Sequence, residues 1–270
     1  MQLNGIPALG CGTYPLTAKE AEATVAMVLE VGHRHIDTAQ LYGNEADVGR
    51  GLKRAGLPRG DVFVTTKVDQ SNYAADHFLP SVRASLDKLQ LAEVDLLLLH
   101  WPPTAPITIE EAVDRLNAAV EQKLCRMIGI SNFTIAMAER AVARSHHPLV
   151  TNQVEFHPLL DQSKLRTACA AKGMTLSAYC PLARGRVLGS PVTSAIAEAH
   201  GVSEGAVVLR WIIQQGVVAL PMTTKRANAE GNLRALSITL TADEMASISA
   251  LTSAATRLVS PAMMRGVWDT

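Results

Sequence analysis

The chain has 270 residues, of which 48% are hydrophobic, and its 25 basic and 25 acidic side chains leave a formal net charge of zero. This length is close to the roughly 250 residues of one (β/α)8 barrel domain. The balanced charge and the pI of about 7.1 give no indication of a nucleic-acid or membrane partner. The apolar runs are far shorter than the roughly 18 residues that cross a bilayer.

The amino terminus and the cysteines predict a cytoplasmic location. Residues 1–5 lack the basic and apolar regions of a secretory signal peptide. The four cysteines are widely scattered and form no Cys-x-x-Cys pair, which favours a reducing compartment over a disulfide framework. We expect each of them to be a small core residue rather than a nucleophile: Cys11, Cys125, Cys169 and Cys180.

Apolar runs with strand character alternate with helical patterns along the whole chain. Helices begin at Thr17, Thr108, Ser203 and Thr241, the last lying outside an eight-fold count, and each threonine opens a capping box. The strand candidates number eight, as in a barrel, and several are apolar on both faces: residues 8–13, 33–38, 62–67, 94–100, 127–131, 150–155, 175–181 and 217–221. We therefore predict an α/β fold. It is a single (β/α)8 TIM barrel domain over residues 1–270, with short loops and a short tail, residues 252–270, over the barrel mouth.

Three consecutive strand candidates end in polar residues that are able to do chemistry. Asp37 ends one strand with Tyr42 just beyond it, Lys67 ends the next, and His100 ends the third. A parallel barrel keeps its active site at the carboxyl ends of its strands, because the loops that follow them are free to vary. We therefore expect these four side chains to meet at that end of the barrel.

Tyr42 is the candidate proton donor. A free phenol has a pKa near ~10, and an ammonium group within about 4 Å, that of Lys67, would lower it. Asp37 would hold this ammonium in place, and a neutral His100 could donate to a substrate carbonyl oxygen. Such a set protonates an alkoxide as it forms, so the matching reaction is reduction of a carbonyl by hydride. The alternative is a structural Asp37–Lys67 ion pair with a surface tyrosine and a core histidine.

The hydride has to come from a cofactor, because no side chain supplies one. The segment Gly10-Cys11-Gly12 lacks the third glycine of a dinucleotide-binding fingerprint, so a Rossmann half is not expected. Ser131, Asn132 and Gln153, at the ends of two neighbouring strands, offer partners for the carboxamide of a nicotinamide nucleotide. Tyr179, late in another strand, offers a flat face for the nicotinamide ring.

A phosphate site is expected after the last strand. The segment Thr223-Thr224-Lys225-Arg226 opens a helix there, and backbone N–H groups and cations at such a position are able to hold a phosphate. A solvated helix end is the alternative interpretation of Lys225 and Arg226.

Seven motifs, in order from residue 9 to about residue 260, resemble those of the aldo-keto reductase family. They are Gly12-Thr13-Tyr14, Asp37-Thr38-Ala39 through Tyr42-Gly43-Asn44-Glu45, Thr65-Thr66-Lys67, Leu99-His100-Trp101-Pro102, Gly129-Ile130-Ser131-Asn132-Phe133, Asn152-Gln153-Val154-Glu155 and Ala178-Tyr179-Cys180-Pro181-Leu182. This resemblance implies a (β/α)8 barrel that binds NADPH/NADP+ in an extended pose, without a metal.

The resemblance also implies a role for individual residues. The family's catalytic tetrad falls on Asp37, Tyr42, Lys67 and His100, with Tyr42 as proton donor. The implied substrate contacts are Tyr14, Tyr42, Asp69, His100 and Trp101. The implied cofactor contacts are Gly12, Thr13, Asp37, Ser131, Asn132, Gln153, Tyr179, Pro181, Leu182, Pro221, Thr223, Thr224, Lys225, Arg226, Asn228 and Asn232.

The compact loops and the tail are similar to those of bacterial 2,5-diketo-D-gluconic acid reductases of the B type, and these are similar to methylglyoxal reductases. The implied function is NADPH-dependent reduction of small activated carbonyls to alcohols. The implied partner is a small-molecule substrate, and we expect a monomer. Three positions depart from the family pattern. Met222 replaces a usual lysine, Asn228 replaces an arginine that often covers the adenine, and Asp69 replaces an aromatic residue, which would make one pocket wall smaller and acidic.

Two other functions compete with a reductase. In a metal-dependent barrel hydrolase, His33 and His35 would share a strand face with Asp37, and His100 and His157 would add ligands. That arrangement would place His33 deep in the barrel, where an open coordination position is inaccessible. The second alternative is a non-catalytic protein that binds NADP(H) and acts as a redox sensor, and an intact tetrad argues against it.

Overall fold

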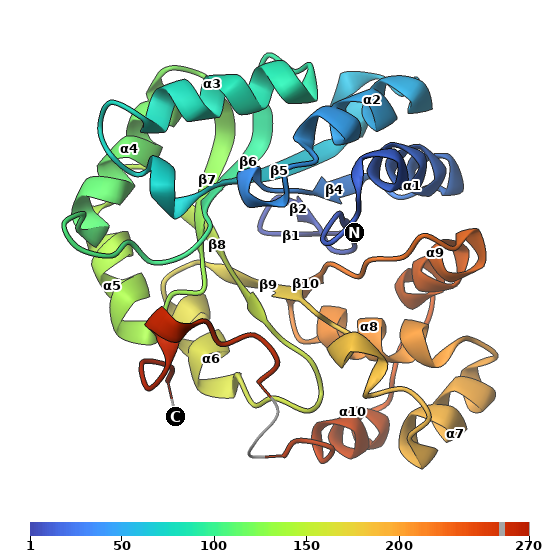
Figure 1. The fold of residues 1–270 in the computed structure, drawn as a ribbon. Helices are drawn as coiled ribbons and strands as arrows, with labels where there is room; N and C mark the ends of the chain where they lie inside the picture. The colour runs from blue at the N-terminus through green and yellow to red at the C-terminus, as the bar shows by residue number, and fades with distance from the viewer. Residues whose placement is uncertain (254–256, 270) are drawn as a thin grey trace.

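Eight parallel strands form the central sheet of the computed structural model, which describes residues 1–253 and 257–269 (Figure 1). Each strand is hydrogen-bonded to the next one along the chain, in the order β3 to β10. Each of the eight predicted regions overlaps one strand, so the prediction of a barrel sheet is confirmed. The strands are β3 Cys11–Gly12, β4 His35–Asp37, β5 Phe63–Val68, β6 Val94–Leu99, β7 Cys125–Ser131, β8 Leu149–Glu155, β9 Thr175–Tyr179 and β10 Val217–Ala219.

The sheet closes on itself where its first and last strands meet. The backbone N–H of Ala219 donates to the carbonyl of Ala8, and that of Gly10 donates to the carbonyl of Ala219, both at 2.9 Å. Gly12 donates in the same way to Pro221, also at 2.9 Å. Closure pairs the strand edges that an open sheet would expose. The result is the predicted (β/α)8 barrel.

The helices form an outer layer around the sheet (Figure 1). The predicted capping boxes are confirmed at Thr17, Thr108 and Thr241, where the glutamate three residues later accepts from the threonine N–H. Such a cap contributes about 1 kcal/mol to helix stability. The helices are α1 Ala18–Val31, α2 Glu45–Ala55, α3 Phe78–Leu89, α4 Ile109–Glu121, α5 Ile135–Arg144, α6 Ser163–Ala171, α7 Pro191–His200, α8 Glu204–Gln214, α9 Arg226–Leu233 and α10 Ala242–Ser249. None of them, within the described residues, is long and apolar enough to cross a bilayer.

A short hairpin that the sequence did not predict precedes the barrel. Its strands are β1 Gln2–Leu3 and β2 Ile6–Pro7, which pair antiparallel. The side-chain amide of Asn4, in the turn, donates to the carbonyls of Val150 and Gly173, at 2.7 and 2.9 Å. Because Val150 lies near the start of β8 and Gly173 precedes β9, the hairpin is fastened to the amino-terminal end of the barrel.

The predicted common face of His33, His35 and Asp37 is wrong, because β4 begins only at His35. The His33 ring instead packs towards α9, with Nε2 at 3.0 Å from the carbonyl oxygen of Ala229. The His35 ring bonds to Thr65 Oγ1 at 3.0 Å. Among the residues that the structure describes, no three His, Cys, Asp or Glu side chains form a group that could hold a metal ion.

The tail packs at the mouth of the barrel, as predicted, over the part that the structure describes. Val259 lines the cavity at the mouth, and the ring of Trp268 lies with its centroid 6.4 Å from that of Trp101. Residues 254–256 and 270 of the predicted tail lie outside the described residues.

Candidate active site

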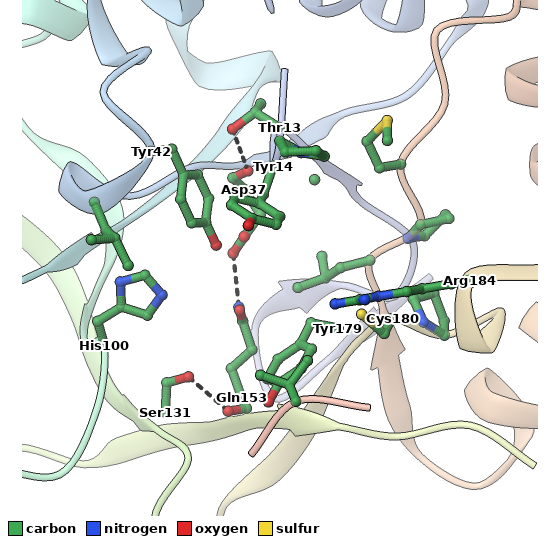
Figure 2. Close-up of a pocket in the computed structure, with 18 of the residues that line it drawn as sticks. Thr13, Tyr14, Asp37, Tyr42, His100, Ser131, Gln153, Tyr179, Cys180 and Arg184 are labelled. Atoms are coloured by element: carbon green, nitrogen blue, oxygen red, sulfur yellow. Dashed lines mark hydrogen bonds between the residues drawn. The ribbon is translucent and has the colours of Figure 1, made fainter. Parts of the chain in front are cut away.

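A cavity of about 730 Å³ opens where the strands end (Figure 2). This volume is within the range of cofactor and small-molecule sites. Side chains from the ends of β4, β7, β8 and β9 and from the loops after β3 and β6 reach it. The predicted residues that line it are Gly12, Thr13, Tyr14, Asp37, Tyr42, His100, Trp101, Ser131, Asn132, Gln153, Tyr179, Pro181, Leu182 and Pro221.

The ammonium group of Lys67 lies behind this wall and is fully buried. It donates to Asp37 Oδ1 at 2.5 Å, to the carbonyl oxygen of Thr38 at 2.8 Å and to the hydroxyl of Tyr42 at 3.3 Å. All three ammonium protons therefore have acceptors, as a buried cation requires. The structure thus joins Asp37, Lys67 and Tyr42 into one hydrogen-bonded chain that ends at a phenol facing the cavity.

One pKa along this series of hydrogen-bonded side chains differs from the prediction. Burial lowers the pKa of Lys67, but the neighbouring Asp37 carboxylate and Tyr42 outweigh it, so this pKa lies above the ordinary 10.5. The pKa of Tyr42 is raised above 10, because burial opposes the phenolate more than Lys67 favours it. The predicted net lowering of the Tyr42 pKa is therefore wrong. Lys67 still offsets part of the burial effect and keeps Tyr42 a better acid than burial alone would allow.

His100 stands beside Tyr42, with ring centroids 5.6 Å apart and ring planes at 77° (Figure 2). Burial, reinforced by the charge of Lys67, lowers the pKa of His100 to about 3. The imidazole is therefore neutral at physiological pH, as expected from the sequence. Its Nδ1 is buried and has no hydrogen-bond partner among the described residues. A neutral ring here can present an N–H to an oxygen acceptor in the cavity.

The predicted nicotinamide contacts lie together on the wall formed by β7, β8 and β9. Tyr179 donates its hydroxyl to Asn132 Oδ1 at 2.8 Å, and Asn132 Nδ2 donates to the hydroxyl of Ser131 at 3.0 Å. Gln153 donates Nε2 to Asp37 Oδ2 at 2.8 Å, and its Oε1 accepts no hydrogen bond from the described residues. An aromatic face beside the unused amide oxygen of Gln153 suits a nicotinamide ring and its carboxamide. The residues present therefore fit this cofactor.

The residues predicted to hold the phosphate end do not line the cavity. This holds for Thr223, Thr224, Lys225, Arg226, Asn228 and Asn232. Arg226, the first residue of α9, is half exposed and pairs with Glu30 at 2.6 Å and with Glu230 at 3.9 Å. An exposed pair of this kind contributes only about 0–1 kcal/mol, so a phosphate could compete for the guanidinium.

Two sequence predictions about single residues are wrong. Asp69 does not line the cavity, because its carboxylate turns back to accept from the N–H of Ser71 at 3.0 Å and from its hydroxyl at 2.6 Å. Cys180 is not a core residue, because it is partly exposed and lines the cavity (Figure 2). The other cysteines, Cys11, Cys125 and Cys169, are buried as expected.

The sequence prediction also missed residues that line the cavity. Among the described lining residues, Arg184 is the only one with a cationic side chain, and it lies across the cavity from Tyr42 and His100 (Figure 2). Its position two residues after the motif that ends in Leu182 could have indicated it. Leu41 and Val259 also line the cavity. Val259 comes from the tail, where no local pattern indicates a site.

Comparisons with known proteins agree with this geometry. A model of the aldo/keto reductase family matches residues 4–253. Methylglyoxal reductase DkgB of Escherichia coli O157:H7 is 39% identical over 266 residues, which cover 98% of this chain and 99% of the relative. A solved structure with the provisional name 2,5-diketo-D-gluconic acid reductase B has a TM-score of 0.96 and 41% identity, over 99% of this chain and 95% of that chain. An aldo-keto reductase of Bombyx mori, solved in complex with NADP, has a TM-score of 0.91 and 30% identity, over 98% and 96%.

Proposed function

The chain belongs to the aldo/keto reductase family and is an NADP-dependent oxidoreductase, and we propose that it reduces small activated carbonyls to alcohols, with Tyr42 as the proton donor. The proposed substrates are 2-oxo-aldehydes such as methylglyoxal, diketo sugar acids such as 2,5-diketogluconate, and simple aldehydes. The observation that carries the proposal is the chain from Asp37 through Lys67 to the Tyr42 hydroxyl beside a neutral His100. The family assignment favours neither a metal-dependent hydrolase nor a non-catalytic sensor.

The proposed mechanism divides the work among these side chains. NADPH, when bound, supplies the hydride. Tyr179, Asn132 and Gln153 would hold the nicotinamide group on their wall. His100, neutral, would donate an N–H to the carbonyl oxygen and orient it towards Tyr42. Tyr42 would then give its proton to the oxygen as negative charge develops there, while the Lys67 ammonium stabilises the phenolate that remains.

We expect small activated carbonyls to be better substrates than large apolar ones. The mouth is open on the side of Tyr14 and Leu41, which are 58% and 59% exposed, and the loop between His100 and α4 is short. Such a mouth buries little of a large ligand, and burial is worth only about 25 cal/mol per Å². An adjacent carbonyl instead lowers the intrinsic barrier to hydride attack. Methylglyoxal and 2,5-diketogluconate should therefore have kcat/KM values at least about tenfold above those of decanal and a steroid ketone, a difference of 1.4 kcal/mol.

Competition kinetics with NADPH would test this order, with methylglyoxal present together with each apolar substrate in turn. A higher kcat/KM for decanal or for the steroid ketone would contradict the proposed substrate class. The acidic wall that Asp69 was predicted to form does not contribute to this argument, since its carboxylate faces Ser71.

The second expected result concerns the nucleotide. Lys225 and Arg226 can pair with a 2′-phosphate, and a hydrogen bond to a charged group is worth roughly 1.5–3 kcal/mol. NADPH should therefore bind at least about tenfold more tightly than NADH, and the double variant Lys225→Gln/Arg226→Gln should lose most of that difference. Dissociation constants from the quenching of protein fluorescence measure both.

Glu30→Gln is the matched control for this pair. It removes the carboxylate that binds Arg226 at 2.6 Å but leaves both cations in place, so the preference for NADPH should persist or increase. If the double variant kept its preference, another group would be reading the 2′-phosphate.

A further inference from the structure

Glu155 has no role in the mechanism above, although it ends β8 and is fully buried. Its carboxylate oxygens accept three hydrogen bonds. Oε1 accepts from the backbone N–H of Leu258 at 2.7 Å, and Oε2 accepts from that of Val259 at 2.8 Å. The ring of His157, also fully buried, lies with Nε2 at 2.9 Å from Oε1. A strand end is thus tied to the tail, about a hundred residues away, by both oxygens of one buried carboxylate.

The segment held in this way forms part of the cavity wall. Val259 is the only one of the described residues after α10 that lines the cavity. The guanidinium of Arg257 lies 4.0 Å from the ring centre of Trp268, whose Nε1 donates to the hydroxyl of Ser260 at 3.0 Å. Trp268 in turn packs on Trp101, which lines the cavity next to His100. Displacement of residues 257–259 would therefore change the wall on the substrate side.

No strand or α-helix holds residues 257–259 in place. The far end of the tail has attachments of its own. The Met264 side chain is buried, and Asp269 Oδ2 accepts from the N–H of Ile135, at the start of α5, at 2.9 Å. Among the described side chains, that of Glu155 binds the tail backbone at the cavity, in the stretch between the end of α10 and this distal region. Loss of its carboxylate should loosen the wall locally and leave the distal end attached.

We propose that Glu155 is a specificity-determining positioning residue, whose carboxylate clamps the tail backbone and so fixes Val259 in the cavity wall, with Trp268 packed behind Trp101, and that this wall limits the entry of bulky carbonyl substrates. This inference rests on the proposed function for the identity of the substrates. Hydrogen bonds to a charged acceptor are about twice as strong as neutral ones. One carboxylate with two backbone donors is therefore an effective way to fix a segment that lacks regular structure.

Glu155→Gln tests the clamp directly. The amide keeps the shape of the side chain, but one of its two ends becomes a donor and faces an N–H. The exchange of the amide hydrogens of Leu258 and Val259 with deuterium should accelerate at least about tenfold. In the same variant, the ratio of kcat/KM for methylglyoxal to that for decanal should fall at least about fivefold. The Kd of NADPH should stay within about twofold of the wild-type value.

Two control variants separate the clamp from other effects. Glu45 is also a buried glutamate, and it accepts from the hydroxyls of Thr66 and Ser85 without touching the tail. Glu45→Gln should leave exchange at residues 258 and 259 and the substrate ratio unchanged. Val259→Ala removes wall volume but keeps the backbone bonds, so it should lower the ratio without faster exchange.

Three results would overturn the inference: unchanged exchange at residues 258 and 259, an unchanged substrate ratio despite faster exchange, or a loss of NADPH affinity above about tenfold. The last would mean that Glu155 acts through the neighbouring Tyr179 instead of the tail. If Glu155→Gln does not fold, Leu258→Pro removes one of the two backbone donors and leaves the carboxylate in place. Proline has no amide hydrogen, so the exchange prediction then applies to Val259 alone, and the predictions for the substrate ratio and NADPH binding are unchanged. Exchange and NADPH binding do not depend on the substrate. They therefore remain decisive even if methylglyoxal is not reduced and the proposed function fails.

Discussion

Replacement of Tyr42 by phenylalanine is expected to lower kcat for carbonyl reduction by about 10²–10⁴, the usual worth of general acid catalysis. The change removes only the hydroxyl that accepts from Lys67 at 3.3 Å. The ring remains to pack against Tyr14, with centroids 5.1 Å apart, and against His100. The Kd of NADPH should therefore stay near the wild-type value, and single-turnover kinetics at saturating NADPH would locate the defect in the chemical step.

Tyr14→Phe is the matched control. Tyr14 lines the same cavity, but its side chain is 58% exposed and is not hydrogen-bonded to Lys67. Removal of its hydroxyl should change kcat by less than about threefold, well below the contribution of a general acid. If the Tyr42→Phe protein kept more than about a third of wild-type kcat, a group other than Tyr42 would be the proton donor.

Replacement of Lys67 by methionine is expected to reduce both stability and activity. Asp37, only 4% exposed, would become a buried carboxylate without its cation, and the loss of one partner of a buried pair costs about 3–5 kcal/mol of unfolding free energy. Because Lys67 lowers the pKa of Tyr42 against the effect of burial, its loss should raise that pKa further. The phenol becomes a weaker acid, and kcat should fall at least about a hundredfold.

The double variant Lys67→Met/Asp37→Asn separates the two effects. It removes both charges, so much of the lost unfolding free energy should return, as measured by urea denaturation. Activity should not return, because the cation beside Tyr42 is still absent. Lys172→Met serves as the control, since Lys172 is 3.9 Å from Glu139 and the two side chains are 44% and 55% exposed, and an exposed pair contributes about 0–1 kcal/mol. Recovery of kcat in the double variant would mean that Lys67 has only a structural role.

The sequence by itself determined the barrel and the core of the site. Apolar runs in the sequence identify buried parallel strands, and capping boxes such as that of Thr108 and Glu111 identify helix starts. Both signals can be recognised in the sequence because they involve residues that are close together in the chain. Asp37, Lys67 and His100 could be grouped without coordinates, since the carboxyl ends of parallel strands meet at one end of a barrel. The neutral His100 that the sequence analysis expected is also present, because burial lowers its pKa to about 3.

Only the tertiary structure decided the features that depend on distant or summed contacts. The ion pair of Arg226 with Glu30 and the bond of Glu155 to the tail join residues far apart in the chain, and no periodicity encodes them. Asp69 is a separate case, because a local turn that the sequence analysis did not predict directs its side chain to Ser71. The pKa of Tyr42 rises because burial is the sum of contributions from every element around the phenol, and it outweighs the effect of the nearby Lys67 ammonium.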